Sequence, residues 1–273
     1  MKNTDSIEVL GSKLDARGAR AGLFDFDGTL SLIRSGWVDV MVPMMVEILL
    51  ELKTGESEEE IRTIVRDWVD RLTGKQTIYQ MIELAHQIEL RGGQPQDPLY
   101  YKRRYLDLLH CKIAGRLEDL RSGNVAPERH LVPGSRDLLI ALRERGLSLY
   151  LASGTDQDLV REEARLLDVD KYFDGGVYGA LDDYKSFSKK LLIQQLLAKP
   201  GLACTTILGF GDGYVEIENV KEANGVAIGV ATDEPDCRSV DEWKRGRLAG
   251  AGADIIIANF ECRPALFDLI FLQ

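Results

Sequence analysis

Leu23-Phe24-Asp25-Phe26-Asp27-Gly28-Thr29-Leu30 ends an apolar run with two carboxylates one residue apart and then turns at a glycine. Side chains two residues apart on a strand point to the same face, so Asp25 and Asp27 would both project from its carboxyl edge, and Gly28 lets the chain bend. Two acids this close repel each other unless a cation neutralises them or one of them binds a proton. The stretch predicts a buried strand that ends in a reactive acid pair, although an ordinary acidic turn has the same composition.

The composition is that of a globular protein. The chain has 273 residues, 45% of them hydrophobic and 29% charged, enough for one large domain or for a core with an inserted module. No window approaches the roughly 18 apolar residues of a membrane span, and the first residues lack the apolar segment of a secretory signal. Four cysteines lie far apart without a CxxC pair, so the sequence indicates neither a zinc cluster nor a disulfide framework. We therefore expect a protein of the reducing cytoplasm. A net charge of −10 argues against a nucleic-acid partner, but a small anion can still bind where a few cations converge.

Strand and helix patterns alternate along much of the chain. Continuous apolar, β-branched runs predict strands buried on both faces at residues 21–26, 147–152, 205–210, 226–230 and 254–258. Helical patterns occur at residues 135–145, 156–167, 188–198, 215–223 and 238–248. This alternation predicts an α/β fold with a Rossmann-like parallel sheet sandwiched by helices.

Residues 31–130 have a different pattern. Amphipathic helical windows occupy residues 37–53, 58–72, 78–91 and 98–120, and no run resembles a strand. We therefore expect an all-helical cap domain at residues 31–130, inserted into a discontinuous α/β core of residues 1–30 and 131–273. The expected hinges are residues 31–36 and the proline- and glycine-containing segment 125–134.

Ser153-Gly154-Thr155 follows a predicted strand and precedes a predicted helix. Such a junction offers a hydroxyl, free backbone N–H groups and the positive end of a helix dipole, which together suit a phosphate oxygen. Simple helix capping would use the same residue types.

Gly209-Phe210-Gly211-Asp212-Gly213-Tyr214-Val215-Glu216 also ends an apolar run, with two acids in a glycine-rich turn. If Asp212 and Glu216 flank the start of a helix, their carboxylates could complete or support an oxygen site for Mg²⁺. The glycines also suggest the dinucleotide motif GxGxxG. Tyr214 stands at its third glycine, however, and Asp212 would face a pyrophosphate with its own charge, so we favour the magnesium interpretation.

Lysines precede the predicted helix of residues 188–198. A lysine at a helix start opposes the favourable sign of the dipole, although most lysines simply solvate a surface. One ammonium near the acid-rich edge could neutralise a phosphoryl group and a nucleophile together. The candidates are Lys189 and Lys185.

The order of these motifs closely resembles that of the haloacid dehalogenase superfamily of phosphohydrolases. The family motifs would be DxDGT at Asp25–Thr29, the serine at Ser153, the lysine at Lys189 and GDxxxD at residues 211–216. Glu216 stands where the family more often has aspartate. The inserted helices resemble the cap of the branch that contains phosphoglycolate phosphatase and β-phosphoglucomutase.

The resemblance implies a Mg²⁺-dependent phosphatase acting on a small phosphorylated metabolite. Asp25 would form an aspartyl phosphate, with Asp27 as general acid and base. The implied ligands of Mg²⁺ are Asp25, Asp27 through its backbone carbonyl, Asp212 and, through water, Glu216. The implied phosphate-binding residues are Ser153, Gly154, Thr29 and Lys189, or Lys185 in its place.

Three other functions stay open at this level. A phosphomutase acting on a sugar phosphate would use the same motifs if the cap kept water from the intermediate. A non-catalytic phosphate-binding protein would keep the fold without turnover, but the presence of both Asp25 and Asp27 counts against it. A signalling receiver also combines an acid cluster with a Ser/Thr and a Lys, but receivers are much shorter and carry the phosphorylated acid on a later strand than the acid pair. Arg34, in the predicted hinge, is a candidate contact for the leaving group. The sequence leaves the oligomeric state open.

Overall fold

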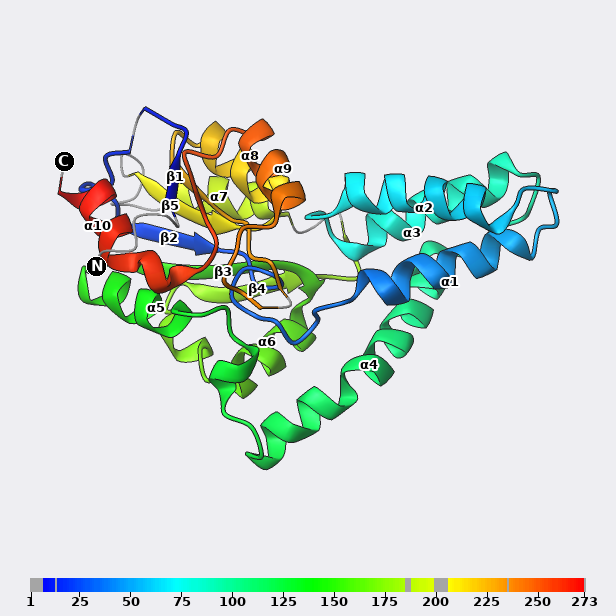
Figure 1. Ribbon diagram of the computed structural model, residues 1–273, viewed down its shortest axis with the longest axis horizontal. Coiled ribbons are helices and arrows are strands. Elements are labelled where there is room, and N and C mark those ends of the chain that lie inside the picture. Colours follow the sequence, from blue (N-terminus) through cyan, green and yellow to red (C-terminus); the bar gives the residue numbers. More distant parts are fainter. Residues whose placement is uncertain (1–6, 13, 185–187, 199–205, 235, 273) are drawn as a thin grey trace.

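The computed structural model describes residues 7–12, 14–184, 188–198, 206–234 and 236–272. Within these ranges seven strands form one sheet in the order β1-β7-β6-β5-β2-β3-β4 (Figure 1). The strands are β1 (Ile7–Val9), β2 (Ala21–Phe24), β3 (Ser148–Asp156), β4 (Gly176–Ala180), β5 (Ile207–Gly211), β6 (Val226–Val230) and β7 (Ile255–Ile257). All neighbouring pairs are parallel except β1 with β7. The predicted Rossmann-like sheet is confirmed, with one antiparallel edge strand.

Six helices in the described part of the chain cover the two faces of this sheet. Five of them were predicted, and the sixth, at Arg263–Phe271, was not. One face carries α5 (Ser135–Glu144), α6 (Gln157–Leu166) and α10 (Arg263–Phe271), and the other carries α7 (Lys189–Leu197), α8 (Tyr214–Glu222) and α9 (Glu242–Gly250) (Figure 1). Successive side chains of β2 pack into the two opposite layers, Leu23 among α7 to α9 and Phe24 against Phe210 and Phe173. Burial on both faces explains why the central strands are apolar without alternation.

The remaining long helices form one inserted unit between β2 and α5. They are α1 (Val38–Leu50), α2 (Glu58–Leu72), α3 (Thr77–Leu90) and α4 (Pro98–Ser122), and residues 25–147, all of them described, contain no strand. Trp68 is buried among these helices and Trp37 partly buried, as expected of residues that pack the cap. The inserted all-helical cap is confirmed, and its boundaries at residues 31 and 130 stay a prediction.

Local signals set the limits of the cap helices. Ser57 caps α2, and its hydroxyl and the Glu60 carboxylate bond reciprocally to each other's backbone N–H groups. Asp97 caps α4 just before Pro98, and α4 ends at Gly123, whose φ of 71° favours glycine. These signals explain why the predicted windows at 58–72 and 98–120 nearly match the helices.

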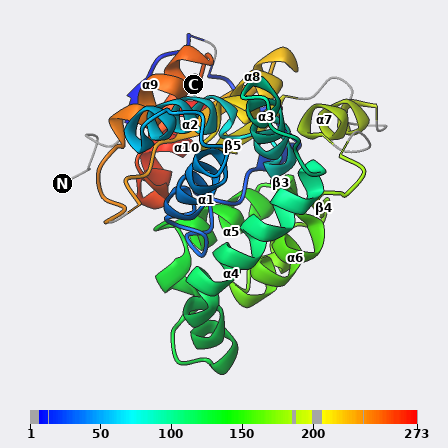
Figure 2. The same cartoon turned by 90° about the vertical axis from the view of Figure 1, so that its right-hand side faces the viewer.

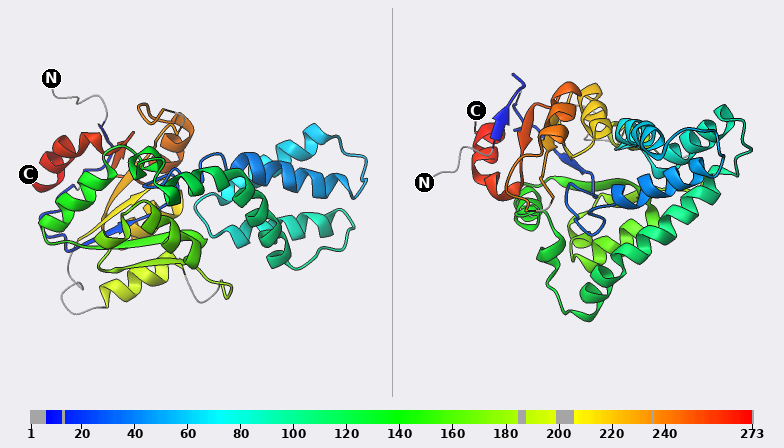
Figure 3. Two further views of the ribbon diagram at one scale, coloured as in Figure 1. Left: turned by 90° about the horizontal axis from the view of Figure 1, so that it is seen from below. Right: turned by 45° about the vertical axis from the view of Figure 1, so that its right-hand side comes forward.

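The cap lies at the end of the core where β2 points, away from α10 (Figures 1 and 3). Viewed from that side, α1, α2 and α3 lie in front of the sheet (Figure 2). Short 3-10 helices at Pro127–His130, Asp170–Tyr172 and Phe260–Cys262 complete the connections. None of the described helices combines the length and the apolar character that crossing a bilayer would require.

Candidate active site

The candidate residues lie at the carboxyl ends of three adjacent strands. Asp25 and Asp212 follow β2 and β5, whereas Ser153 lies within β3, which runs to Asp156 and so beyond the predicted end at residue 152. Phe24, the last residue of β2, pairs with Leu151 of β3 and Phe210 of β5. Asp25 continues this register, because its N–H donates to the carbonyl of Phe210 at 2.9 Å. Parallel strands end at the same edge, so the segments around Asp25, Ser153 and Asp212, which are far apart in the sequence, meet under the cap.

The turn after β2 depends on Gly28. Its φ is +75°, and a Cβ there would lie 2.2 Å from Oδ2 of Asp212. Thr29 lies beside it, where its hydroxyl accepts from the N–H of Asp212 at 2.9 Å and lies 3.5 Å from Oδ2 of Asp25. Thr29, predicted to contact phosphate, thus links the two acids Asp25 and Asp212.

Asp25 contacts the predicted lysine. The Lys189 ammonium lies 2.7 Å from Oδ1 of Asp25 and also contacts Oε1 of Glu216. All three side chains are at least nine-tenths buried. The other oxygen of Glu216, Oε2, has no hydrogen-bond partner among the described residues. Lys185, the alternative lysine, lies outside the described residues.

Asp27 has a different environment from Asp25. Its Oδ2 accepts hydrogen bonds from Ser153 at 3.0 Å and from Thr155 at 2.8 Å. Burial raises the pKa of Asp27, the charge of Asp25 adds to this effect, and Arg34 and the two hydroxyls oppose it. A raised pKa keeps a carboxyl group protonated more of the time, which suits a proton donor.

Asp212 pairs with a lysine that the sequence analysis did not select. Lys244 of α9 lies 3.1 Å from Oδ2 of Asp212 and 2.8 Å from Oε1 of Glu234, and Glu234 accepts a hydrogen bond from Ser35. Burial raises the pKa of Asp212 to about 7; Lys244 opposes this shift, and the charges of Asp25 and Glu234 add to it.

Arg34 lines the same cavity, but its guanidinium is mainly engaged elsewhere. Its Nε and Nη2 donate to the Glu163 carboxylate of α6 at 2.7 to 3.1 Å, and Nε lies 3.7 Å from Oδ1 of Asp27. Both residues of the Arg34–Glu163 pair are more than nine-tenths buried. The Arg34–Glu163 ion pair therefore connects the predicted hinge to helix α6 of the core. The contact of Arg34 with a leaving group stays a prediction.

Replacing Arg34 with methionine should lower the free energy of unfolding by about 3–5 kcal/mol, because Glu163 would stay buried without its partner. The double variant Arg34→Met/Glu163→Leu should recover most of this loss, as measured by urea unfolding. Arg121→Met is the matched control, since the Arg121–Glu162 pair is exposed and should contribute about 1 kcal/mol or less. Equal losses in the free energy of unfolding for Arg34→Met and Arg121→Met would contradict the prediction that the buried Arg34–Glu163 pair matters more than the exposed one.

The acids, the lysine and the hydroxyls line one small cavity of about 100 Å³. Its roof belongs to the cap: Trp37 and Met41, the α2–α3 loop of residues 73–77, Gln80 and Tyr105. A Cβ on Gly154 would lie 2.9 Å from the carbonyl oxygen of Lys75, so this glycine lets the loop lie directly on the end of β3. The cavity is well below the roughly 300–1,000 Å³ of sites for drug-sized ligands, and a small ligand therefore fits it best.

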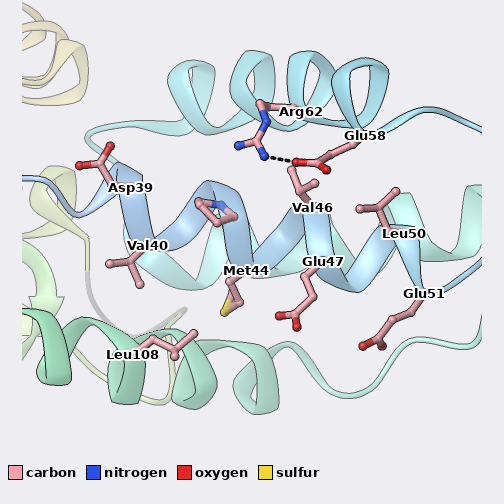
Figure 4. Close-up of a pocket in the computed structure, with 11 residues that line it drawn as sticks. Asp39, Val40, Met44, Val46, Glu47, Leu50, Glu51, Glu58, Arg62 and Leu108 are labelled. Carbon is pink, nitrogen blue, oxygen red and sulfur yellow. Dashed lines mark hydrogen bonds and ion pairs between the residues drawn. The ribbon is translucent and has the colours of Figure 1, made fainter.

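A larger groove of about 770 Å³ lies on the cap itself, between α1, α2 and α4 (Figure 4). Acidic side chains such as Glu47 and Glu51 flank apolar ones such as Met44 and Leu108, and Glu58 pairs with Arg62. None of the acids at the sheet edge lines this groove, so volume alone does not identify the site.

The sheet edge has the chemistry of a site for a hard cation. Asp25 and Asp212 are linked through Thr29, the backbone of Asp27 lies in the same turn, and Glu216 has an oxygen without a hydrogen-bond partner. No group of three acidic, histidine or cysteine side chains in the described part of the chain is arranged as a complete metal site. Two carboxylates and a backbone carbonyl nevertheless fit Mg²⁺, which takes few protein ligands and keeps several waters.

Comparisons with known proteins agree with this geometry. The family model described as haloacid dehalogenase-like hydrolase matches residues 19–224. A phosphoglycolate phosphatase of Escherichia coli is 28% identical over 218 residues, which cover 79% of this chain and 81% of that protein. A haloacid dehalogenase-like hydrolase of Streptococcus pneumoniae superposes with a TM-score of 0.56 at 17% identity, covering 92% of this chain and 99% of the other. A structure from Haemophilus somnus titled a predicted phosphoglycolate phosphatase gives 0.58 at 15% identity, covering 91% and 98%.

Proposed function

The chain belongs to the haloacid dehalogenase-like hydrolases, and we propose that it is a Mg²⁺-dependent phosphatase acting on a small phosphorylated metabolite through an aspartyl phosphate on Asp25. The observation that carries this proposal is the unequal acid pair. Asp25 lies against the Lys189 ammonium, whereas Asp27 bonds to two hydroxyls and has a raised pKa. Acids whose environments differ in this way are suited to opposite roles, one as nucleophile and one as proton donor.

In the first step a carboxylate oxygen of Asp25 attacks phosphorus in line with the ester oxygen. An O–P bond forms to Asp25, the bond from phosphorus to the leaving oxygen breaks, and Asp27 donates its proton to that oxygen. In the second step Asp27 takes a proton from water, which attacks the aspartyl phosphate, releases inorganic phosphate and restores Asp25. Both steps need Asp27 within reach of the oxygen on the far side of phosphorus from Asp25.

Charge neutralisation is the main catalytic requirement, because anionic nucleophiles repel a phosphomonoester. Lys189 and Ser153 would bind the phosphoryl oxygens, assisted by the backbone N–H of Gly154 and by Thr29. Lys189 and Ser153 now contact Asp25 and Asp27, so a bound phosphate would share them with these acids. Asp25, the carbonyl of Asp27 and Asp212 would hold Mg²⁺, with Glu216 through water, and the ion would supply the positive charge that the phosphate and the acids require together.

The phosphomutase alternative would use the same residues. A mutase must also keep a whole sugar phosphate beside the phosphorylated aspartate while excluding water. A panel of phosphate esters, including two- and three-carbon, hexose and nucleotide phosphates, tests the proposal. We expect release of inorganic phosphate with Mg²⁺ and none after chelation. Conversion of one sugar phosphate to another without release would favour the mutase, and inactivity towards every ester would favour a non-catalytic protein.

Binding of Mg²⁺ should depend on pH because Asp212 must be ionised to serve as a ligand. Burial raises the pKa of Asp212 from its ordinary value of 3.8 to about 7 in the fold, so the metal-free fold loses stability from this group as the pH rises from about 4 through 7. Mg²⁺ binds the ionised form, so its affinity should be about tenfold higher at pH 8 than at pH 6. Calorimetry and the Mg²⁺-induced shift in Tm measure this. Asp212→Asn should bind weakly at both pH values, and equal affinity of the unmodified protein at both would contradict the prediction.

A further inference from the structure

The last turn of cap helix α2 bonds to a residue of the core. The final carbonyl groups of a helix lack the regular partners of its interior and carry the negative end of its dipole. That of Asp70 accepts the N–H of Thr73 at 3.3 Å. Arg247, on α9, donates through Nη1 to the carbonyl of Asp70, and its Nη2 lies 3.5 Å from the carbonyl of Thr73. A core guanidinium thus caps the C-terminus of a cap helix.

The α2–α3 loop begins at this capped end. Residues Thr73, Gly74, Lys75 and Thr77 of the loop line the cavity above the acid pair. Gly74, with a φ of +95°, faces Gly213 of the core so closely that a Cβ on Gly213 would lie 3.0 Å from the Cα of Gly74. Arg247 therefore holds the end of a cap loop that lies close to Gly154 and to Gly213 of the core.

The arginine is itself held in place. Its guanidinium lies 4.6 Å from the ring centre of Trp243 and 5.1 Å from that of Tyr214. A planar guanidinium can stack on aromatic rings while its edge donates to carbonyl oxygens, whereas a lysine ammonium cannot do both equally well. Stacking fixes the direction of the donors, so their bonds to α2 need little further ordering.

We propose that Arg247 is a positioning residue that fixes the α2–α3 loop in its closed place over the active site by capping α2 across the boundary between cap and core. It touches no reacting atom. The effect of Arg247 on turnover rests on the proposed phosphatase function. The effect of Arg247 on the α2–α3 loop is independent of that function. Without Arg247 the closed arrangement is a smaller fraction of the population, and a ligand must supply the difference on binding.

Hydrogen–deuterium exchange of the ligand-free protein tests the effect on the loop. Arg247→Met should increase exchange in residues 73–77 by about tenfold, since hydrogen bonds to a charged group are among the stronger ones. Arg247→Lys should give an intermediate increase. Arg245→Met is the matched control, because Arg245 lies on the same helix but pairs with Glu8 of β1. It should leave the loop unchanged, and an unchanged loop in Arg247→Met would overturn the proposal.

A second variant changes the contact between the same loop and strand β3 of the core. Gly154→Ala keeps the backbone N–H but places a Cβ against the Lys75 carbonyl, so it should raise exchange in the same residues even if Arg247→Met folds poorly. Unchanged exchange in a folded Gly154→Ala protein would also count against a loop that closes directly on the core.

Kinetics separate the two proposals. For a small ester, Arg247→Met should raise KM by about tenfold and change kcat by less than about twofold, because bound substrate draws the loop closed. A loss confined to kcat would overturn the positioning role. If the unmodified protein hydrolyses nothing with Mg²⁺, the proposed function fails, and the exchange measurements still decide the role of Arg247.

Discussion

Asp25→Asn is expected to lower phosphate-ester hydrolysis by about 10⁵-fold or more. An amide oxygen is a far weaker nucleophile than a carboxylate, and nucleophile and supporting groups act as a unit, so removing the nucleophile alone abolishes nearly all their benefit. Steady-state release of inorganic phosphate measures the rate. Acid quenching during turnover should trap phosphate on the unmodified protein and none on the variant.

The fold of the Asp25→Asn variant should remain intact. Asparagine has nearly the same shape as aspartate, the backbone bond from residue 25 to Phe210 is unaffected, and Lys189 retains Glu216 as a partner. A matching circular dichroism spectrum would separate loss of the nucleophile from loss of the fold. Activity within tenfold of that of the unmodified protein would mean that another acid is the nucleophile, for which Asp212 is a candidate.

The central part of the fold could be predicted because its strands are buried on both faces. The residues of β5, β6 and β7 are apolar throughout, and no other element type explains such short runs so well. The edge strands give no such signal. β1 has only three residues, none of them buried, and the first three residues of β4 are only partly buried. Their place in the sheet comes from tertiary pairing with β7 and β3.

The same contrast applies to the site. Asp25, Ser153 and Asp212 directly follow or end predicted strands, so the parallel order of the sheet brings them to one edge. Lys244 and Arg247 lie within a helical pattern that is rich in charged residues, as solvent-exposed helices are. The neighbouring sequence does not indicate that Lys244 reaches Asp212 or that Arg247 reaches the end of α2. Glu163 did leave a signal, because it occupies the apolar stripe of α6 with Val160 and Ala164.

Asp27→Asn should separate the two carboxylates by the kind of ester they hydrolyse. An alkoxide is a poor leaving group without a proton, so kcat for alkyl phosphates should fall by about 10²- to 10⁴-fold. p-Nitrophenolate leaves without protonation, so formation of the aspartyl phosphate from p-nitrophenyl phosphate should be affected much less. Rapid-quench measurement of the first turnover isolates this step, and a burst of nitrophenolate should precede slow hydrolysis, which still needs a base at residue 27.

The loss of alkyl phosphate hydrolysis in Asp27→Asn should not result from a displaced side chain at residue 27. The amide oxygen of an asparagine can accept the same two hydroxyl hydrogen bonds from Ser153 and Thr155, so the side chain should stay in place. Ser153→Ala is the matched comparison. It removes a hydroxyl that we propose binds a phosphoryl oxygen, which should slow the hydrolysis of alkyl and nitrophenyl esters by a similar factor. If Asp27→Asn also slowed the first turnover of both esters equally, residue 27 would act on phosphate binding, and the proton donor would have to be another group.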